Sequence, residues 1–151
     1  IAHSNNKLKE KLACELKDKG YQFESIILPT ASISKTVRIG EGVIINAHAT
    51  IMPFAKIGNH VMVHSNVVVE HDNILEDFAN LAPGVTLAGW VHVKKGAYIH
   101  TGASVIPNTT VGAHSIVGAG ATVIEDVPRN VTVVGTPAKI MASKEGILNN
   151  E

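Results

Sequence analysis

Four polar residues, Glu70-His71-Asp72-Asn73, interrupt an otherwise apolar stretch of the chain. A histidine beside a carboxylate suits general-base catalysis, because the carboxylate can orient the imidazole while the ring accepts a proton near neutral pH. The chain has eight histidines, and no other one stands next to a carboxylate. His71 is therefore the candidate base, and Asp72 is the residue expected to orient it.

The remaining histidines are predicted to be ordinary strand or surface residues. No His-x-His or His-x-x-x-x-His spacing occurs, and His60 and His114 are 54 residues apart on one repeat position. Ligands of one metal ion must converge within bonding distance of it. The sequence therefore predicts no metal site within one subunit.

The element that must position His71 is a ladder of aliphatic residues, one every six positions from Ile33 to Val123. All sixteen of these ladder positions are Ile, Leu or Val. A second column, four residues after each of them, contains Ser, Thr, Ala or Val at fourteen of fifteen positions and fails only at Asn73. A short fixed period predicts repeats that stack on their neighbours to bury an apolar face.

The period of six favours neither an α-helix nor a single amphipathic strand. It fits a coil with three short strands joined by turns, in which the aliphatic ladder points inward. Eighteen residues then form one coil, and coils stack at about 4.8 Å. The predicted fold is a mainly β protein, a parallel β-helix of about five coils preceded by a short α/β segment.

The coil repeat brings a second candidate residue to His71. Gly89 follows His71 by eighteen residues and should lie directly against it in the next coil. A glycine leaves its backbone N–H unobstructed, and such a donor can stabilise an oxyanion. A base beside a free N–H, about 5 Å away, favours acyl transfer.

Composition excludes several other classes of protein. The formal net charge is zero, which gives no indication of nucleic-acid or anionic-membrane binding. No apolar run approaches the ~18 residues of a membrane span, and no signal peptide is evident. The single cysteine excludes an intrachain disulfide framework. A cytoplasmic protein is therefore expected.

Three segments are expected along the chain. Residues 1–29 are predicted to be the end of an α/β domain whose upstream part is missing, with a helix after Asn5 or Asn6 and an extended stretch before Pro29. Residues 30–135 form the β-helix, and residues 136–151 form a polar tail.

Several motifs resemble those of the left-handed β-helix acyltransferases. These motifs are the Ile-Gly hexads, residues 69–72, Ala82-Pro83-Gly84, residues 118–121 and residues 135–139. More narrowly, the chain resembles bacterial sugar acyltransferases related to sialic acid O-acetyltransferase. That group includes N-acetyltransferases that act on nucleotide-linked 4-amino sugars in bacillosamine and perosamine synthesis.

The resemblance implies a homotrimer with an acetyl-CoA site between neighbouring subunits. It implies that His71 is the general base, that Asp72 tunes it, and that the Gly89 N–H faces the thioester carbonyl. Asn80, Thr101, Gly118 and Ala119 would line the acetyl-CoA groove, and His64, Ser4 and Asn6 would contact the sugar substrate.

The expected reaction is acetyl transfer from acetyl-CoA to a nucleotide-linked amino sugar, without a metal, in a ternary complex. O-acetylation of a sugar or sialic acid uses the same residues and stays open. A metal enzyme like gamma-class carbonic anhydrase would need three histidines converging across a trimer interface. A non-catalytic β-helix for structure or ice binding should show a Thr-x-Thr ladder, and the sequence has none.

Overall fold

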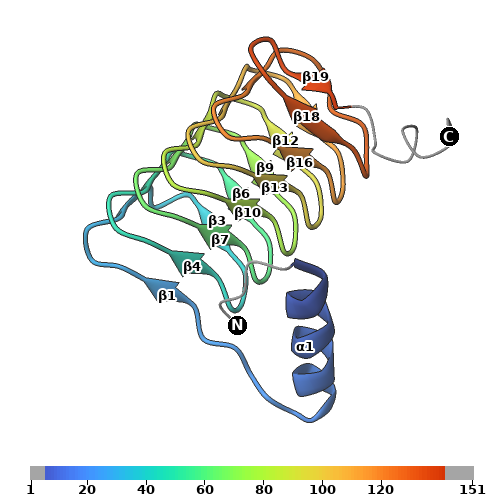
Figure 1. Cartoon of the computed structure of the whole chain (residues 1–151). Helices are drawn as coiled ribbons and strands as arrows, with labels where there is room; N and C mark the ends of the chain where they lie inside the picture. The colour runs from blue at the N-terminus through green and yellow to red at the C-terminus, as the bar shows by residue number, and fades with distance from the viewer. Residues whose placement is uncertain (1–5, 142–151) are drawn as a thin grey trace, which may run out of the picture.

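A computed structural model describes residues 6–141 of the chain. The main body is a parallel β-helix, and Figure 1 shows its coils stacked into a prism with α1 beside the N-terminal coils. The short strands of the coils form three sheets, which we name A, B and C in the order in which the chain first enters them. This architecture confirms the predicted fold class.

The elements are named here by sheet, and α1 spans Asn6–Asp18. Sheet A contains β1 (Ile26–Ile27), β4 (Ile44–Ile45), β7 (Met62–Val63), β10 (Asn80–Leu81), β13 (Tyr98–Ile99), β16 (Ile116–Val117), β18 (Thr132–Val134) and β19 (Lys139–Ile140). Sheet B contains β2 (Ser32–Ile33), β5 (Thr50–Ile51), β8 (Val68–Val69), β11 (Thr86–Leu87), β14 (Ser104–Val105) and β17 (Thr122–Val123). Sheet C contains β3 (Arg38–Ile39), β6 (Lys56–Ile57), β9 (Ile74–Leu75), β12 (His92–Val93) and β15 (Thr110–Val111).

The aliphatic ladder points into the prism as predicted. Strand partners in adjacent coils are eighteen residues apart, as for Leu81 with Ile99 and Leu87 with Val105. From Ile45 onward the ladder residues are almost completely buried, and the column of small residues is buried with them. A close-packed interior of this kind fixes the register of every coil, because a slip by one residue would turn the apolar set outward.

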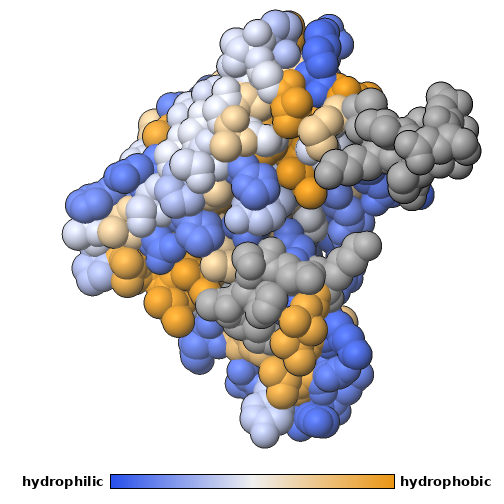
Figure 2. All heavy atoms as spheres, viewed as in Figure 1, coloured by the Kyte–Doolittle hydropathy of each residue, from blue (hydrophilic) through white to orange (hydrophobic). Residues whose placement is uncertain are grey.

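The prism has about six turns, one more than the ladder alone accounts for. The additional length comes from its two ends. β1, which was predicted to belong to the α/β segment, pairs in parallel with β4, and β18 pairs with β16 beyond the last ladder residue. Ile26 and Ile27 of β1 are exposed, and they belong to the hydrophobic surface over β1 in Figure 2.

The corners of the prism turn through residues with positive φ, three positions after the ladder residue. Many of these residues are not glycine, including Phe54 (65°), Asp72 (59°) and Trp90 (63°). The left-handed region is uncommon for residues with a Cβ. Hydrogen bonds to the stacked coils on either side hold the backbone in this conformation. The positive φ of Asp72 therefore sets the direction of its side chain at the corner beside His71.

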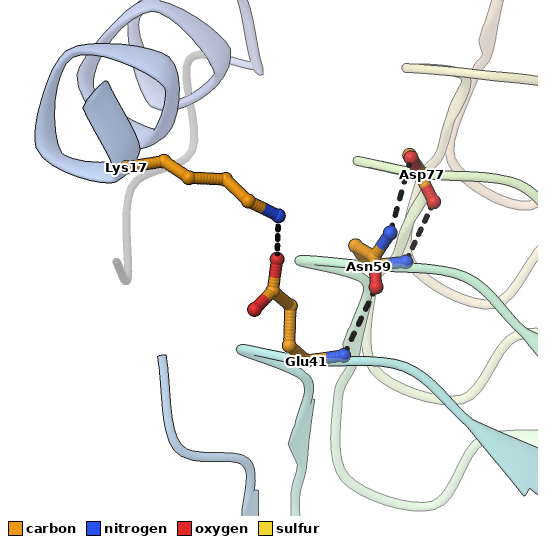
Figure 3. A network of polar contacts seen from close by, with 4 residues as sticks. All are labelled: Lys17, Glu41, Asn59 and Asp77. Atoms are coloured by element: carbon orange, nitrogen blue, oxygen red, sulfur yellow. Dashed lines mark hydrogen bonds and ion pairs between the residues drawn. The ribbon is translucent and has the colours of Figure 1, made fainter. Parts of the chain in front are cut away.

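A polar network ties α1 to three successive coils (Figure 3). Lys17 of α1 pairs with Glu41, the Glu41 N–H donates to Asn59 Oδ1 (3.0 Å), and the Asn59 N–H donates to Asp77 Oδ1 (2.6 Å). A second ion pair joins Glu10 of α1 to Lys95 in the next coil. These contacts align α1 along the edge of the prism between sheets C and A.

The most deeply buried side chains of α1 include a lysine. Leu8 is 39 % exposed, whereas Ala13 and Lys9 are almost completely buried. Burial lowers the pKa of Lys9 to about 8, because an ammonium group loses hydration in this position. Lys17 and Glu10 form the ion pairs of α1 with the prism.

Candidate active site

The predicted base and its acidic neighbour form a direct pair on the edge between sheets B and C, which we call the B–C edge. His71 and Asp72 follow β8 at this corner, and His71 Nδ1 lies 2.9 Å from Asp72 Oδ2. The His71 side chain is 49 % exposed, so a substrate can reach it. The contact through Nδ1 leaves Nε2 free to accept a proton.

Gly89 lies against the imidazole as predicted. A Cβ added at Gly89 would be 2.7 Å from His71 Cε1 and 2.8 Å from His71 Nε2, so the free side of the ring covers the glycine. The Gly89 N–H donates to no carbonyl within residues 6–141. A proton acceptor and an unpaired N–H donor therefore lie side by side on adjacent coils, an arrangement suited to acyl transfer.

Asn73 connects the two turns of the candidate site, a contact that was not predicted. The side chain is completely buried, its Nδ2 donates to the Glu70 carbonyl (2.9 Å), and its Oδ1 accepts from the Val91 N–H. Glu70 precedes His71, and Val91 lies just after Gly89 and Trp90. Asn73 thus joins the two turns that carry the candidate base and the candidate oxyanion donor. In the sequence, Asn73 is the one position of the second column that is not Ser, Thr, Ala or Val, and this exception could have indicated a special contact.

Trp90 also borders the site and was not predicted to do so. Its ring meets His71 edge to face with centroids 6.3 Å apart, and the side chain is 58 % exposed. One coil below Asp72, Phe54 is exposed to a similar extent. Exposed aromatic residues of this size commonly mark binding surfaces.

Two other predicted residues lie on the outer side of sheet A, away from His71. His64 directly follows β7, and Asn80 begins β10, where it is buried. Asn46 Nδ2 lies 3.4 Å from His64 Nδ1. Burial lowers the pKa of His64, and a contact with Asn80 opposes that shift in part.

The predicted acetyl-CoA residues lie on the same side of the prism as His64, where sheet A leads into sheet B. Thr101, Gly118 and Ala119 follow β13 and β16 at the edge between sheets A and B, which we call the A–B edge. A Cβ at Gly118 would be 2.7 Å from Val134 Cγ1, so this glycine makes room for β18. Within one chain, these residues are separated from His71 by the width of sheet B.

The predicted N-terminal substrate residues do not join either group. Asn6 begins α1, and its Nδ2 donates to the Gly96 carbonyl (3.0 Å) at the corner between sheets C and A. Ser4 lies outside the described residues. The single chain therefore unites His71, Asp72 and Gly89, whereas His64 and the acetyl-CoA candidates lie at the A–B edge and Asn6 lies at the corner between sheets C and A.

Two further properties bear on the predictions. Within residues 6–141, no three His, Cys, Asp or Glu side chains gather in a way that could hold a metal ion. The same part of the chain contains no helix with the length and apolar character of a membrane span.

The chain is similar to known proteins in both sequence and structure. The model of the bacterial transferase hexapeptide family (six repeats) matches residues 36–71. The structure also matches GDP-perosamine N-acetyltransferase from Caulobacter crescentus, solved as a histidine-to-alanine variant with CoA and GDP-perosamine. The TM-score is 0.93 at 38 % identity over 95 % of this chain and 68 % of that chain. The chain belongs to the hexapeptide-repeat transferase family.

Other members of the hexapeptide-repeat family are similar along most of the chain. The acetyltransferase domain of PglB from Neisseria gonorrhoeae, solved with acetyl coenzyme A, has a TM-score of 0.91 at 31 % identity and matches 93 % of this chain and 69 % of that chain. Galactoside O-acetyltransferase of Lactococcus lactis is 30 % identical over 108 residues, which is 70 % of this chain and 52 % of that protein. The chain thus spans about half the length of this sequence relative.

Proposed function

We propose that the chain is an acetyl-CoA-dependent acetyltransferase whose acceptor is a nucleotide-linked amino sugar, with His71 as the general base. The observation that carries this proposal is the His71–Asp72 pair lying against the unpaired N–H of Gly89. The similar Caulobacter enzyme, crystallised with CoA and GDP-perosamine, supports the choice of both substrates.

The proposed reaction is a direct transfer. The amine nitrogen of the sugar attacks the thioester carbonyl carbon, and His71 Nε2 accepts the proton that the nitrogen loses. The Gly89 N–H donates a hydrogen bond to the oxyanion of the tetrahedral intermediate. The carbon–sulfur bond then breaks, and the imidazolium returns its proton to the departing CoA thiolate. Asp72 holds the ring at Nδ1 and stabilises its protonated form.

We further propose that the complete site lies between subunits of a homotrimer. The two groups of predicted residues occupy different edges, so a groove that contains both needs a second copy of the chain. Exposed apolar residues lie along the B–C edge with His71, and such a patch favours burial by another subunit. They are Met52, Phe54, Trp90, Ile106 and Ile124. Because acetyl-CoA is a cytoplasmic substrate, we place the reaction in the cytoplasm.

Acetylation of a sugar hydroxyl is the second candidate, and the similarity to galactoside O-acetyltransferase favours it. The same base and oxyanion donor would serve either acceptor. The deciding assay incubates the protein with acetyl-CoA and separate acceptors: UDP- and GDP-linked 4-amino sugars, sialic acid and a galactoside. CoA release and the mass of the product then identify the acceptor.

The substitution His71→Ala tests the proposed role of His71 as the general base. The loss of a general base should lower kcat by about 10²–10⁴. His48→Asn is a suitable control, because it replaces an exposed histidine at a corner with a residue that tolerates positive φ. Unchanged turnover in His71→Ala would refute the assignment of His71.

Subunit mixing tests the proposed location of the site. His71→Ala removes the base, and Ala119→Trp should block the acetyl-CoA groove on the A–B edge. If each site uses His71 of one subunit and Ala119 of its neighbour, co-expressed variants should regain about a quarter of the wild-type activity, the statistical share of intact interfaces. No recovery in demonstrably mixed trimers would place the site within a single subunit.

A further inference from the structure

Sheet C is shorter than the other two sheets at the C-terminal end of the prism. Among the described residues it ends at β15, whereas sheet B continues to β17 and sheet A continues to β18 and β19. In place of a further strand, Val127 forms a single bridge with Val111, and the Asp126 carboxylate accepts a hydrogen bond from the Thr110 N–H (2.7 Å). In this part of the chain, the last coil therefore has strands on only two of its three sides.

A hollow of about 510 Å³ lies at this end of the prism. Val123, Val127 and Val133, which belong to the buried core, line it together with Ala138. Ile140 also lines the hollow and is 58 % exposed. The terminal repeat of a solenoid needs a cap, because it has no further repeat that would cover its apolar face. An apolar segment in the hollow would supply this cap.

The direction of β19 leads the chain toward the open side of the last coil. Each strand of sheet A from β1 to β18 runs from the corner between sheets C and A toward the A–B edge, because the chain passes through the sheets in the order A, B, C. β19 is antiparallel to β18, with Val133 opposite Ile140, so it runs back toward that corner. Met141, the last described residue, follows β19 there and comes to lie beside the end of sheet C.

The residues that follow Met141 have a sequence suited to this hollow. Residues 142–151, which were predicted to be part of a polar tail, lie outside the described residues. They contain two large apolar residues next to each other, Ile147 and Leu148, among residues that are small, polar or charged. Ile147 is six positions after Met141, and an extended chain of this length spans about 20 Å. The apolar pair can therefore reach the hollow from the end of β19.

The charges of the segment also match those of the hollow. Glu125 and Asp126 line the hollow, and Lys144 carries the opposite charge. Gly146 directly precedes Ile147, and a glycine allows the chain to turn sharply at this point. The order of a cation, a glycine and an apolar pair thus corresponds to an acidic border around an apolar floor.

We propose that residues 142–151 fold back onto the C-terminal end of their own chain and that Ile147 and Leu148 fill the hollow. The segment covers the open side of the last coil and shields Ile140 from water. A second copy of the chain is the other source of such a segment. The chain's own segment is favoured because β19 ends beside the hollow, which gives the segment a high effective concentration there.

Thermal unfolding of the complete chain and two double variants tests the role of the apolar pair. Ile147→Ser with Leu148→Ser removes the pair, and Asn149→Ser with Asn150→Ser is a matched control in the same segment. The loss of buried apolar surface should lower the Tm of the first variant by about 4–8 °C, and the control should stay within about 1 °C of the complete chain. Equal Tm values in all three proteins would overturn the proposal.

Photo-cross-linking tests where the segment lies. A benzophenone amino acid in place of Asn149 leaves the apolar pair intact and should cross-link to residues 123–140, which mass spectrometry of the joined peptides would reveal. In assemblies mixed from ¹⁵N-labelled and unlabelled chains, each cross-linked pair should carry one isotope composition. Pairs of mixed composition would assign the hollow to the segment of a neighbouring copy and would overturn the proposal. Cross-links that fall only outside residues 123–140 would overturn it as well.

Discussion

Gly89 lies so close to His71 that a methyl group at Cα would be 2.7 Å from Cε1 of the ring. This contact is shorter than non-bonded carbon atoms tolerate, with their optimum near 3.5–4.0 Å. The glycine therefore does more than expose an N–H. It sets the distance between the candidate proton acceptor and the candidate oxyanion donor, and it allows the imidazole to lie against the neighbouring coil.

Gly89→Ala should move the imidazole away from the coil. Since the productive geometry depends on ångström-scale placement, we expect kcat to fall by about 10²-fold. The thermal midpoint should fall as well, and the same substitution in a His71→Ala background should cost little stability because the clash is gone. Thermal unfolding of the four proteins in this cycle checks the prediction. An equal cost in both backgrounds would locate the strain elsewhere.

Asp72→Asn tests the role of the carboxylate. Asparagine tolerates the positive φ of this position, so the turn should persist. A hydrogen bond to a charged group contributes about 1 kcal/mol more than a neutral one, so kcat should fall about tenfold if the carboxylate stabilises the imidazolium. The KM values for both substrates should stay constant. A change confined to KM would assign Asp72 to substrate binding.

Asn73→Ala should loosen the connection between the two turns of the site. It leaves the Val91 N–H without its partner in a buried position, which typically costs about 1–3 kcal/mol. Urea unfolding measures this loss. Thr109→Ala, which alters a buried polar residue of the same column two coils away, is the control. If Asn73 positions the site, its variant should also lose kcat, and the control should retain it.

His60 gives the protein a pH-dependent contact beneath α1. It lies between Phe23 and Phe78, with ring centroids 4.7 and 5.0 Å away, and burial lowers its pKa. The unfolded chain therefore takes up a proton at this residue more readily than the folded chain. Stability should be complete above about pH 6.5, the ordinary histidine pKa, and should decline as the pH falls below it.

His60→Phe keeps a ring in this position and removes the titration. The loss of unfolding free energy between about pH 8 and pH 5.5 should become smaller in the variant, by at most about 1.4 kcal/mol per pH unit. His64 has a lowered pKa as well, so part of the dependence should remain. An identical pH profile in the two proteins would show that His60 does not control it.

Most of the fold could be predicted from the sequence, because the six-residue period determines both which residues face inward and how the coils align. The ladder residues, the small column and the stacking of Gly89 on His71 all follow from the repeat of eighteen. The ion pairs of α1 with Glu41 and Lys95 were not predicted, because the period carries no information on side-chain pairing.

Other parts of the site could not be predicted for different reasons. The hydrogen bonds of Asn73 depend on the rotamer of a buried amide, and the sequence pattern indicates only that the position is unusual. In the proposed trimer, the approach of the A–B edge to His71 of a neighbouring subunit depends on how the subunits assemble. No local sequence pattern of one chain indicates this relationship.

The eighteen-residue coil makes the chain modular along its axis. Insertion of one complete coil after Trp90 would preserve each inward-facing residue and would leave the His71–Gly89 contact intact. It would, however, carry Thr101 and Ala119 about 5 Å farther from the catalytic pair, one strand spacing. If the proposed acetyl-CoA groove runs between these two regions, the number of coils between them determines the length of the acyl carrier that the groove accommodates.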